Sequence, residues 1–389
     1  MNRLADRAVS LPRSEIRVLF DRAAARADTI RLEVGEPSFP TPAHIVAGAY
    51  EAARAGHTGY GPNGGLIELR ELLSEKVEKV DGFVAHPERI VVTPGGMNAL
   101  YSTYSALLNP GDEVLLPTPG FPNMDGMVGL LGGNPVFYHL EAAAGYLPDP
   151  ERLERLVTDR TRILFLNTPS NPTGAVFPAS LMRDLVEFCN RHNLWLLSDE
   201  VYDELVLDES KAHIAAGIYD EEDRVITVYS FSKVYAMTGW RVGYAVAPPA
   251  VADLLRKLQE PQVSCPSTIS QKAAVAALRG PREPIRAMLD TYRRRRSAAI
   301  RTATSAGLEV VAPAGTLYML VAVRTRGRSM FRFALDLLDS QGVSVAPGSV
   351  FGPGGEGYVR ISLAAPEGQI TEGLGRLAEA CRQEELVHT

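Results

Sequence analysis

The stretch from Arg224 to Ala247, RVITVYSFSKVYAMTGWRVGYAVA, decides how the fold is interpreted. Its two ends, Arg224 to Tyr229 and Val242 to Ala247, are apolar runs typical of buried strands, and Lys233 lies between them. Apolar strands on both sides predict that this lysine sits at a buried sheet end, where an amine must be paired, deprotonated or chemically used. The last option suits a Schiff base, in which a neutral amine condenses with an aldehyde.

The neighbours of Lys233 suit an anionic ligand. Ser230 and Ser232 offer hydroxyl groups, and Arg241 offers a planar fork of donors that matches a phosphate. Taken alone, Lys233 is more simply a solvated lysine at a strand end, but the serines and the arginine favour a cofactor site. The arrangement resembles the lysine motif of pyridoxal-phosphate (PLP) enzymes of fold type I, the class I/II aminotransferase family.

Length and composition indicate an ordinary globular chain. It has 389 residues, of which 46% are hydrophobic and 22% charged, enough for roughly two or three domains. The formal net charge of −6 argues against nucleic acid as a partner. No signal peptide is visible, and no run approaches the ~20 apolar residues that span a bilayer, so no membrane partner is expected. The three cysteines are widely spaced and form no CxxC pair; we therefore expect no metal site and a cytoplasmic location.

Short apolar runs alternate with helical patterns through the middle of the chain. Strands are predicted at 90–92, 113–117, 135–140, 163–167, 194–198, 225–229 and 242–247. Helices are predicted between them at 97–108, 122–131, 151–157 and 178–192. This alternation indicates an α/β fold with a mostly parallel sheet covered on both faces, a three-layer α/β/α domain. Ligands of such sheets bind at the carboxyl ends of the strands.

The flanking regions predict a second, smaller α+β domain. After helices at 250–260, 268–279 and 283–306, strands are expected at 308–311, 317–322, 343–346 and 357–363, with helices at 330–340 and from 369. The chain is therefore divided into an N-terminal segment (1–45) that completes the small domain, a large PLP-binding domain (46–282) and a small C-terminal domain (283–389). Arg293 to Arg296 point in directions about 100° apart, so we expect them to form a solvated helix surface.

Two further motifs follow predicted strands. DEVY begins at Asp199, and Asn167 to Gly174 reads NTPSNPTG. In PLP chemistry a carboxylate such as Asp199 keeps the pyridine nitrogen protonated, so that the ring can accept electrons. Tyr202 and Asn171 could both reach the ring oxygen. Each motif alone could equally well be a helix cap or a turn. The resemblance lies in their order: the family carries NPxNPTG, then Asp-x-x-Tyr, then SxSK with an Arg eight residues after the lysine, and this chain shows the motifs in the same order.

The resemblance implies further cofactor contacts. The backbone of Gly96 and Met97, in TPGGMNAL, would hold phosphate at a helix start. Phe121, in PTPGF, would stack on the pyridine ring, although many relatives carry Tyr-Trp where this chain has Gly120-Phe121. Tyr60 resembles a tyrosine that reaches the phosphate of the neighbouring subunit, which implies a homodimer with shared active sites.

Substrate contacts are implied in the same way. Arg360, in YVRIS, would form a bidentate pair with the substrate α-carboxylate. The backbone of Gly35, in VGEPSFPTP, would also meet that carboxylate, and Asn171 would face substrate as well as cofactor. No decisive second arginine for a dicarboxylate is visible, so the sequence leaves the amino donor and the keto acceptor open.

The resemblance is closest to aspartate-aminotransferase-like members. It implies a transaminase of amino acid metabolism that moves an amino group between an L-amino acid and a 2-keto acid by a ping-pong mechanism, with Lys233, Asp199 and Tyr202 as catalytic residues. One alternative is a PLP-dependent lyase that performs β- or γ-elimination on the same scaffold. The other is a non-catalytic PLP-binding regulatory domain, for which the segment before the first motif is too short to hold a helix-turn-helix domain.

Overall fold

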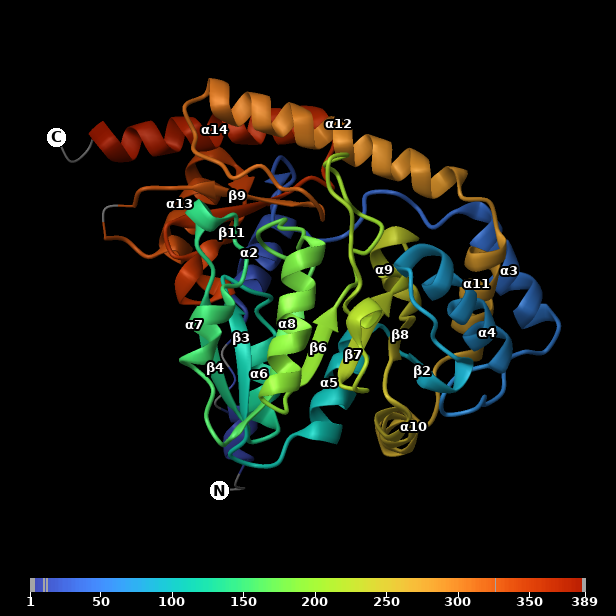
Figure 1. Ribbon diagram of the computed structural model, residues 1–389. Coiled ribbons are helices and arrows are strands. Elements are labelled where there is room, and N and C mark those ends of the chain that lie inside the picture. The colour runs from blue at the N-terminus through green and yellow to red at the C-terminus, as the bar shows by residue number, and fades with distance from the viewer. Residues whose placement is uncertain (1–3, 10, 12, 326, 387–389) are drawn as a thin grey trace.

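The computed structural model describes residues 4–9, 11, 13–325 and 327–386. Its centre is a seven-stranded sheet with the strand order β2-β8-β7-β6-β5-β3-β4 (Figure 1). The strands are β2 (Ile90–Thr93), β3 (Glu113–Thr118), β4 (Asn134–His139), β5 (Thr161–Asn167), β6 (Trp195–Asp199), β7 (Val225–Ser230) and β8 (Gly243–Val246). All neighbours from β4 to β7 pair in parallel, and only β8 runs antiparallel, to both β7 and β2. The predicted α/β class with a mostly parallel sheet is thus confirmed.

Helices cover both faces of this sheet. One face carries α5 (Gly96–Leu107), α6 (Met124–Leu130) and α10 (Pro249–Val263), and the other carries α7 (Pro150–Glu154) and α8 (Ala179–Arg191). Strand β5 shows why its sequence is apolar throughout: Ile163 and Phe165 join the first core, whereas Leu164 and Leu166 join the second. Alternating side chains of one strand are buried on both faces because both faces are covered.

A smaller unit is built from the two ends of the described chain. Its three-stranded antiparallel sheet has the order β11-β12-β9, and two of its helices, α12 and α14, lie above it in Figure 1. Its elements are β9 (Tyr318–Ala322), β11 (Ala346–Pro347), β12 (Tyr358–Ser362), α12 (Glu283–Ser305), α13 (Met330–Gln341) and α14 (Glu367–Leu386). The N-terminal strand β1 (Ile30–Arg31) pairs with β10 (Val343–Ser344), and α2 (Glu15–Ala24) packs against α13. These contacts support the proposed division at 45 and 282, which stays a prediction.

Three helices complete the side of the large sheet that carries β2. They are α3 (Ala43–Arg54), α4 (Ile67–Lys76) and α11 (Thr268–Arg279), with α11 packed against both others. Helix α4 ends at Lys76, because a π-helical turn (Val77–Asp81) follows it and Gly82 closes that turn in the left-handed conformation.

Two sequence expectations are wrong. The strand predicted at 308–311 is a single bridge between Val310 and Val321. The arginines of α12 are not all a solvated surface, because Arg295 donates to the carbonyl oxygens of Leu363 (3.2 Å) and Ala364 (2.8 Å). Arg296 likewise donates to a backbone carbonyl, that of Pro313. Local periodicity shows the direction of a helical side chain but not which distant loop covers it.

Among the described residues, no helix is both long and apolar enough to cross a membrane. The same part of the chain contains no cluster of three or more His, Cys, Asp or Glu side chains arranged to hold a metal ion.

Candidate active site

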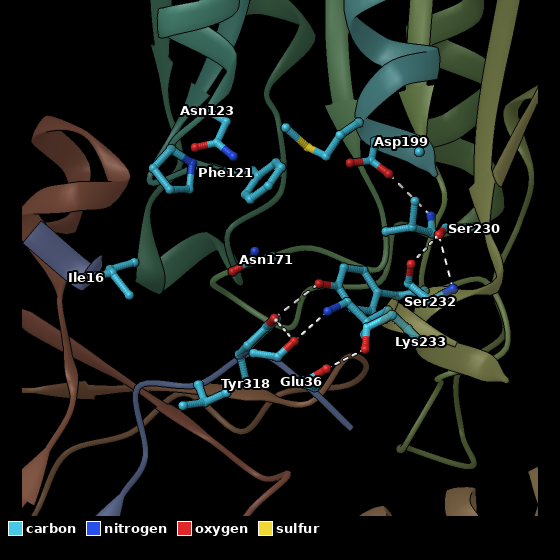
Figure 2. A pocket seen from close by; sticks show the side chains of 18 of the residues that line it. Ile16, Glu36, Phe121, Asn123, Asn171, Asp199, Ser230, Ser232, Lys233 and Tyr318 are labelled. Atoms are coloured by element: carbon cyan, nitrogen blue, oxygen red, sulfur yellow. Dashed lines mark hydrogen bonds between the residues drawn. The ribbon is translucent and has the colours of Figure 1, made fainter. Parts of the chain in front are cut away.

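The carboxyl ends of β5, β6 and β7 open onto a cavity of about 520 Å³ (Figure 2). The three strands end at Asn167, Asp199 and Ser230, and all three residues line the cavity. The predicted site residues that line it are Gly35, Gly96, Met97, Phe121, Asn171, Asp199, Tyr202, Ser230, Ser232, Lys233, Arg241 and Arg360. Tyr60 lies elsewhere: its side chain is 94% exposed and lines a separate cavity with Cys265.

Lys233 is carried by a single helical turn, α9 (Phe231–Val234), directly after β7. The turn begins at Ser230, whose hydroxyl oxygen accepts a hydrogen bond from the backbone N–H of Ser232 (3.1 Å). The Lys233 Nζ donates to the carbonyl oxygen of Gly35, which also accepts from the Tyr318 hydroxyl at 3.4 Å. The amine therefore points into the cavity, where its hydrogen-bond acceptor is a neutral carbonyl oxygen.

Asp199 is buried at the end of β6, and its Oδ1 accepts from the backbone N–H of Val201 at 3.3 Å. Burial raises the pKa of Asp199 to about 7, although the Val201 N–H acts in the opposite direction. A carboxyl group in this environment gains from a cationic partner in the cavity, because positive charge would offset the cost of its burial.

Tyr202 and Asn171 are also buried at strand ends. The Tyr202 hydroxyl donates to that of Tyr318 at 3.3 Å. Asn167 orients both neighbouring loops, because its Oδ1 accepts from the Asn171 N–H (2.6 Å) and its Nδ2 donates to the Asp199 carbonyl (3.0 Å). These bonds hold the loops after β5 and β6 together, so that residues far apart in sequence line one wall.

Arg360 is a buried cation on β12, a strand of the small sheet, and it lines the same cavity. It donates to Asn171 Oδ1 (3.1 Å) and to the carbonyl oxygen of Glu33 (2.8 Å), and it lies 4.1 Å from the centre of the Tyr318 ring. Its Nε is buried with no hydrogen-bond partner among the described residues. Neutral hydrogen-bond partners and an unused donor suit a guanidinium that awaits an anion.

Another end of the cavity combines a helix start with Arg241. The first N–H groups of α5, at Gly96 and Met97, have no acceptor inside their own helix. Arg241 Nη1 donates to the Thr238 carbonyl at 2.9 Å, which leaves its charge uncompensated. A side chain at Gly243 would place its Cβ only 2.6 Å from the Gly96 nitrogen, so only glycine allows this close approach.

The sequence interpretation missed several residues of the cavity. Tyr318 reaches it from β9, and its hydroxyl lies between Tyr202 and Gly35. Burial alone would raise the pKa of Tyr318, but the charges of Lys233 and Arg360 outweigh burial and lower it. Ile16 and Arg17 of α2 also line the cavity, and Arg17 is a second arginine that the sequence pattern did not reveal. No local signal in the sequence of α2 shows that the beginning of this helix reaches the site.

Comparison with known proteins gives a consistent set of relatives. Residues 27–377 match the family described as aminotransferase class I and II. The chain is 38% identical over 386 residues to an aspartate aminotransferase of Pyrococcus abyssi, with 98% of this chain and 99% of the relative covered. It is 38% identical over 387 residues to aromatic-amino-acid aminotransferase 2 of Thermococcus litoralis, with 99% and 100% covered. The solved structure of Thermus thermophilus aspartate aminotransferase with maleate superposes with a TM-score of 0.93 at 35% identity, with 98% and 100% covered.

Proposed function

This chain belongs to the aminotransferase class I and II family and is a transaminase, and from that premise we propose that it works with PLP bound at Lys233. One observation carries the proposal: a single cavity contains an amine with a neutral partner, a buried carboxyl group and a buried arginine whose Nε has no partner among the described residues, namely Lys233, Asp199 and Arg360. The elimination and regulatory alternatives are set aside, since both relatives described above are aminotransferases.

The residues of the cavity fit this cofactor. Its phosphate would meet the α5 start, the Ser230 and Ser232 hydroxyls and Arg241, and Gly243 leaves the backbone there uncovered. Phe121 would form one wall for the ring, and Asp199 would face the ring nitrogen. When bound, PLP supplies an aldehyde for the amine and an electron-accepting ring that stabilises negative charge at the substrate Cα.

The protein side chains would perform the remaining tasks. Arg360 binds the α-carboxylate of the amino acid or keto acid, with Asn171 and the Gly35 backbone beside it. Lys233, once its amine is free, moves a proton at the substrate Cα, a role that typically contributes 10²–10⁴-fold in rate. Asp199 holds a proton at the ring nitrogen, and Tyr202 donates towards the ring oxygen.

We further propose a homodimer in which Tyr60 completes the partner's site. Tyr60 lies in the loop between α3 and α4, and these helices carry two further exposed large side chains, Tyr50 and Ile67. Such a surface on a soluble chain suits an interface. A cytoplasmic location is supported by the three free cysteines.

A half-reaction assay tests the proposed function. The purified protein is loaded with PLP, and the absorbance of the bound cofactor is followed while single L-amino acids are added. Aspartate and aromatic amino acids belong in the panel because relatives are named for them. We expect the absorbance to change with a productive donor and to return when a 2-keto acid is added. A protein that binds PLP but gives no such cycle with any donor of the panel would contradict the proposal.

A further inference from the structure

The loop after β6 is held from outside the cavity as well as from within it. Asp199 and Tyr202 line the cavity. The acidic residues between and beyond them, Glu200, Asp203 and Glu204, bind donors supplied by other parts of the chain. These acidic side chains form none of the substrate or cofactor contacts proposed above, so their contacts need another explanation.

Lys76 is a buried cation among these outer partners. Its side chain, at the end of α4, is only 8% exposed. The Nζ contacts a carboxylate oxygen of Asp203, lies 2.9 Å from Asp81 Oδ2 and stands 4.6 Å from the centre of the Tyr229 ring. Asp203 follows Tyr202 directly, and Tyr229 precedes Ser230. One buried cation therefore touches both chain segments that supply the active site.

Lys76 keeps its positive charge in this environment. Burial alone would lower its pKa, but the charge of Asp203 outweighs burial and holds that pKa well above its ordinary value. Burial raises the pKa of Asp81 to about 7, although Lys76 acts against this. A buried ion pair is often no more stabilising than packed apolar side chains, so its presence here suits a role in placing the loop.

The two other acidic residues have comparable contacts. Glu200 Oε2 accepts from the Tyr229 hydroxyl at 2.9 Å and lies 3.1 Å from His213 Nε2. Arg282 binds Glu204 and also donates to the Tyr235 hydroxyl at 2.9 Å, directly after α9. The Glu200–Tyr229 bond and the Arg282 bridge from Glu204 to Tyr235 both link the loop after β6 to the β7–α9 segment. Lys76 adds a third link, through Asp203 and Tyr229.

We propose that Lys76 is a positioning residue for transamination, which fixes the Asp199–Tyr202 segment relative to the Ser230–Lys233 segment through Asp203 and Tyr229. The inference rests on the proposed function, since the relative placement matters only if both segments hold one cofactor. Asp199 and Lys233 must act on the same bound molecule, and a displacement of about 1 Å can cost 10²-fold in rate.

The test uses a double variant, Lys76→Met with Asp203→Asn, because removing the lysine alone would leave Asp203 buried and unpaired. Two controls are matched to it. Lys79→Met removes a lysine three positions on, which is 71% exposed and pairs with Glu75. Leu69→Ala opens a cavity in the same helix and reduces stability without touching a charge. If the double variant fails to fold, the single variant Asp203→Asn is measured instead, because Lys76 then still has Asp81 as its ion-pair partner.

Two measurements decide the outcome. In the cofactor-free protein, hydrogen exchange should become faster in peptides covering 199–204 and 229–235 of the double variant but not of Lys79→Met. In the PLP-loaded protein, kcat of the double variant should fall by about 10- to 100-fold with little change in KM. The conservative variant Lys76→Arg should lose less kcat than the double variant. Unchanged exchange and kcat within about twofold of the original would overturn the inference, as would equal effects in Leu69→Ala. If the original protein neither binds PLP nor transaminates, the proposed function fails instead, and hydrogen exchange still tests the placement.

Discussion

Two lysines near the site, the buried Lys76 and the half-buried Lys233, show that environment decides what a residue can do. Lys76 faces the carboxylates of Asp81 and Asp203, which keep it charged. Lys233 has a different partner, because it donates to the neutral carbonyl oxygen of Gly35. The second environment suits an amine that must become neutral to react.

Asp199→Ala should separate cofactor binding from chemistry. The variant loses the carboxyl group that we propose to face the ring, so proton removal at the substrate Cα should slow by about 10²–10³-fold while PLP still binds. Stopped-flow absorbance of a single half-reaction measures the rate, and a PLP titration measures retention. Single-turnover rates equal to those of the original protein would remove Asp199 from the proposed site.

Arg360→Lys should weaken substrate binding through its geometry. Lysine keeps the charge but loses the planar fork that meets a carboxylate with two hydrogen bonds. Losing such a charged hydrogen bond costs about 1.5–3 kcal/mol, or roughly 10- to 150-fold in KM for both the amino acid and the keto acid. Arg382→Lys, in an exposed pair with Glu379 of the same unit, is the control and should leave KM unchanged. An unaltered KM in Arg360→Lys would exclude the carboxylate contact.

At the scale of elements, the site lies where adjacent parallel strands end. In the register of the sheet, Asn167 pairs with Asp199 across β5 and β6, so motifs 32 positions apart in the chain become neighbours. The start of α5 approaches β8 closely at Gly96 and Gly243. Strand ends and one helix start therefore form the proposed cofactor site together.

Gly243→Ala tests this close approach. The added Cβ would lie 2.6 Å from the Gly96 nitrogen, so the start of α5 must shift. We expect lower PLP affinity and a stability loss of about 1–3 kcal/mol from overpacking. Gly239→Ala is the matched control, because no atom lies within 4 Å of its added Cβ. Fluorescence titration with PLP and thermal unfolding measure both effects, and equal behaviour of the two variants would refute the steric argument.

Elements and strand-end motifs could be predicted from sequence because their signals are local. The apolar run of β5 and the turn NTPSNPTG each lie in one short stretch. The sequence did not reveal Tyr318 and Arg17 as site residues. They reach the cavity from β9 and α2, and only long-range packing places them in the same cavity as Lys233. The same limit explains Arg295, whose partners Leu363 and Ala364 are distant in sequence.

At the scale of the whole molecule, both units contribute to one cavity. Gly35 and Arg360 come from the N-terminal segment and the small sheet, whereas Asn171 and Lys233 come from the large sheet. The hydrogen bonds from Lys233 to Gly35 and from Arg360 to Asn171 cross between them. Bound substrate would therefore contact both units at once.

The proposed dimer predicts that two inactive variants rescue each other. In a two-fold dimer, one site of a mixed pair takes Tyr60 from one chain and Lys233 from the other. Mixing Tyr60→Asp with Lys233→Ala should restore part of the activity once subunits exchange. Activity of the mixture and mass spectrometry of the mixed dimer are measured together. Subunit exchange without any recovery would show that Tyr60 does not act across an interface.

The attachment of PLP to Lys233 is the central claim, and borohydride reduction tests it most directly. The PLP-loaded protein is reduced, digested, and mapped by mass spectrometry, with Lys233→Ala treated in parallel. We predict a reduced pyridoxyl label on the peptide that contains Lys233 and no stable label in the variant. A label on any other lysine, or a Lys233→Ala protein that transaminates at the original rate, would contradict the account.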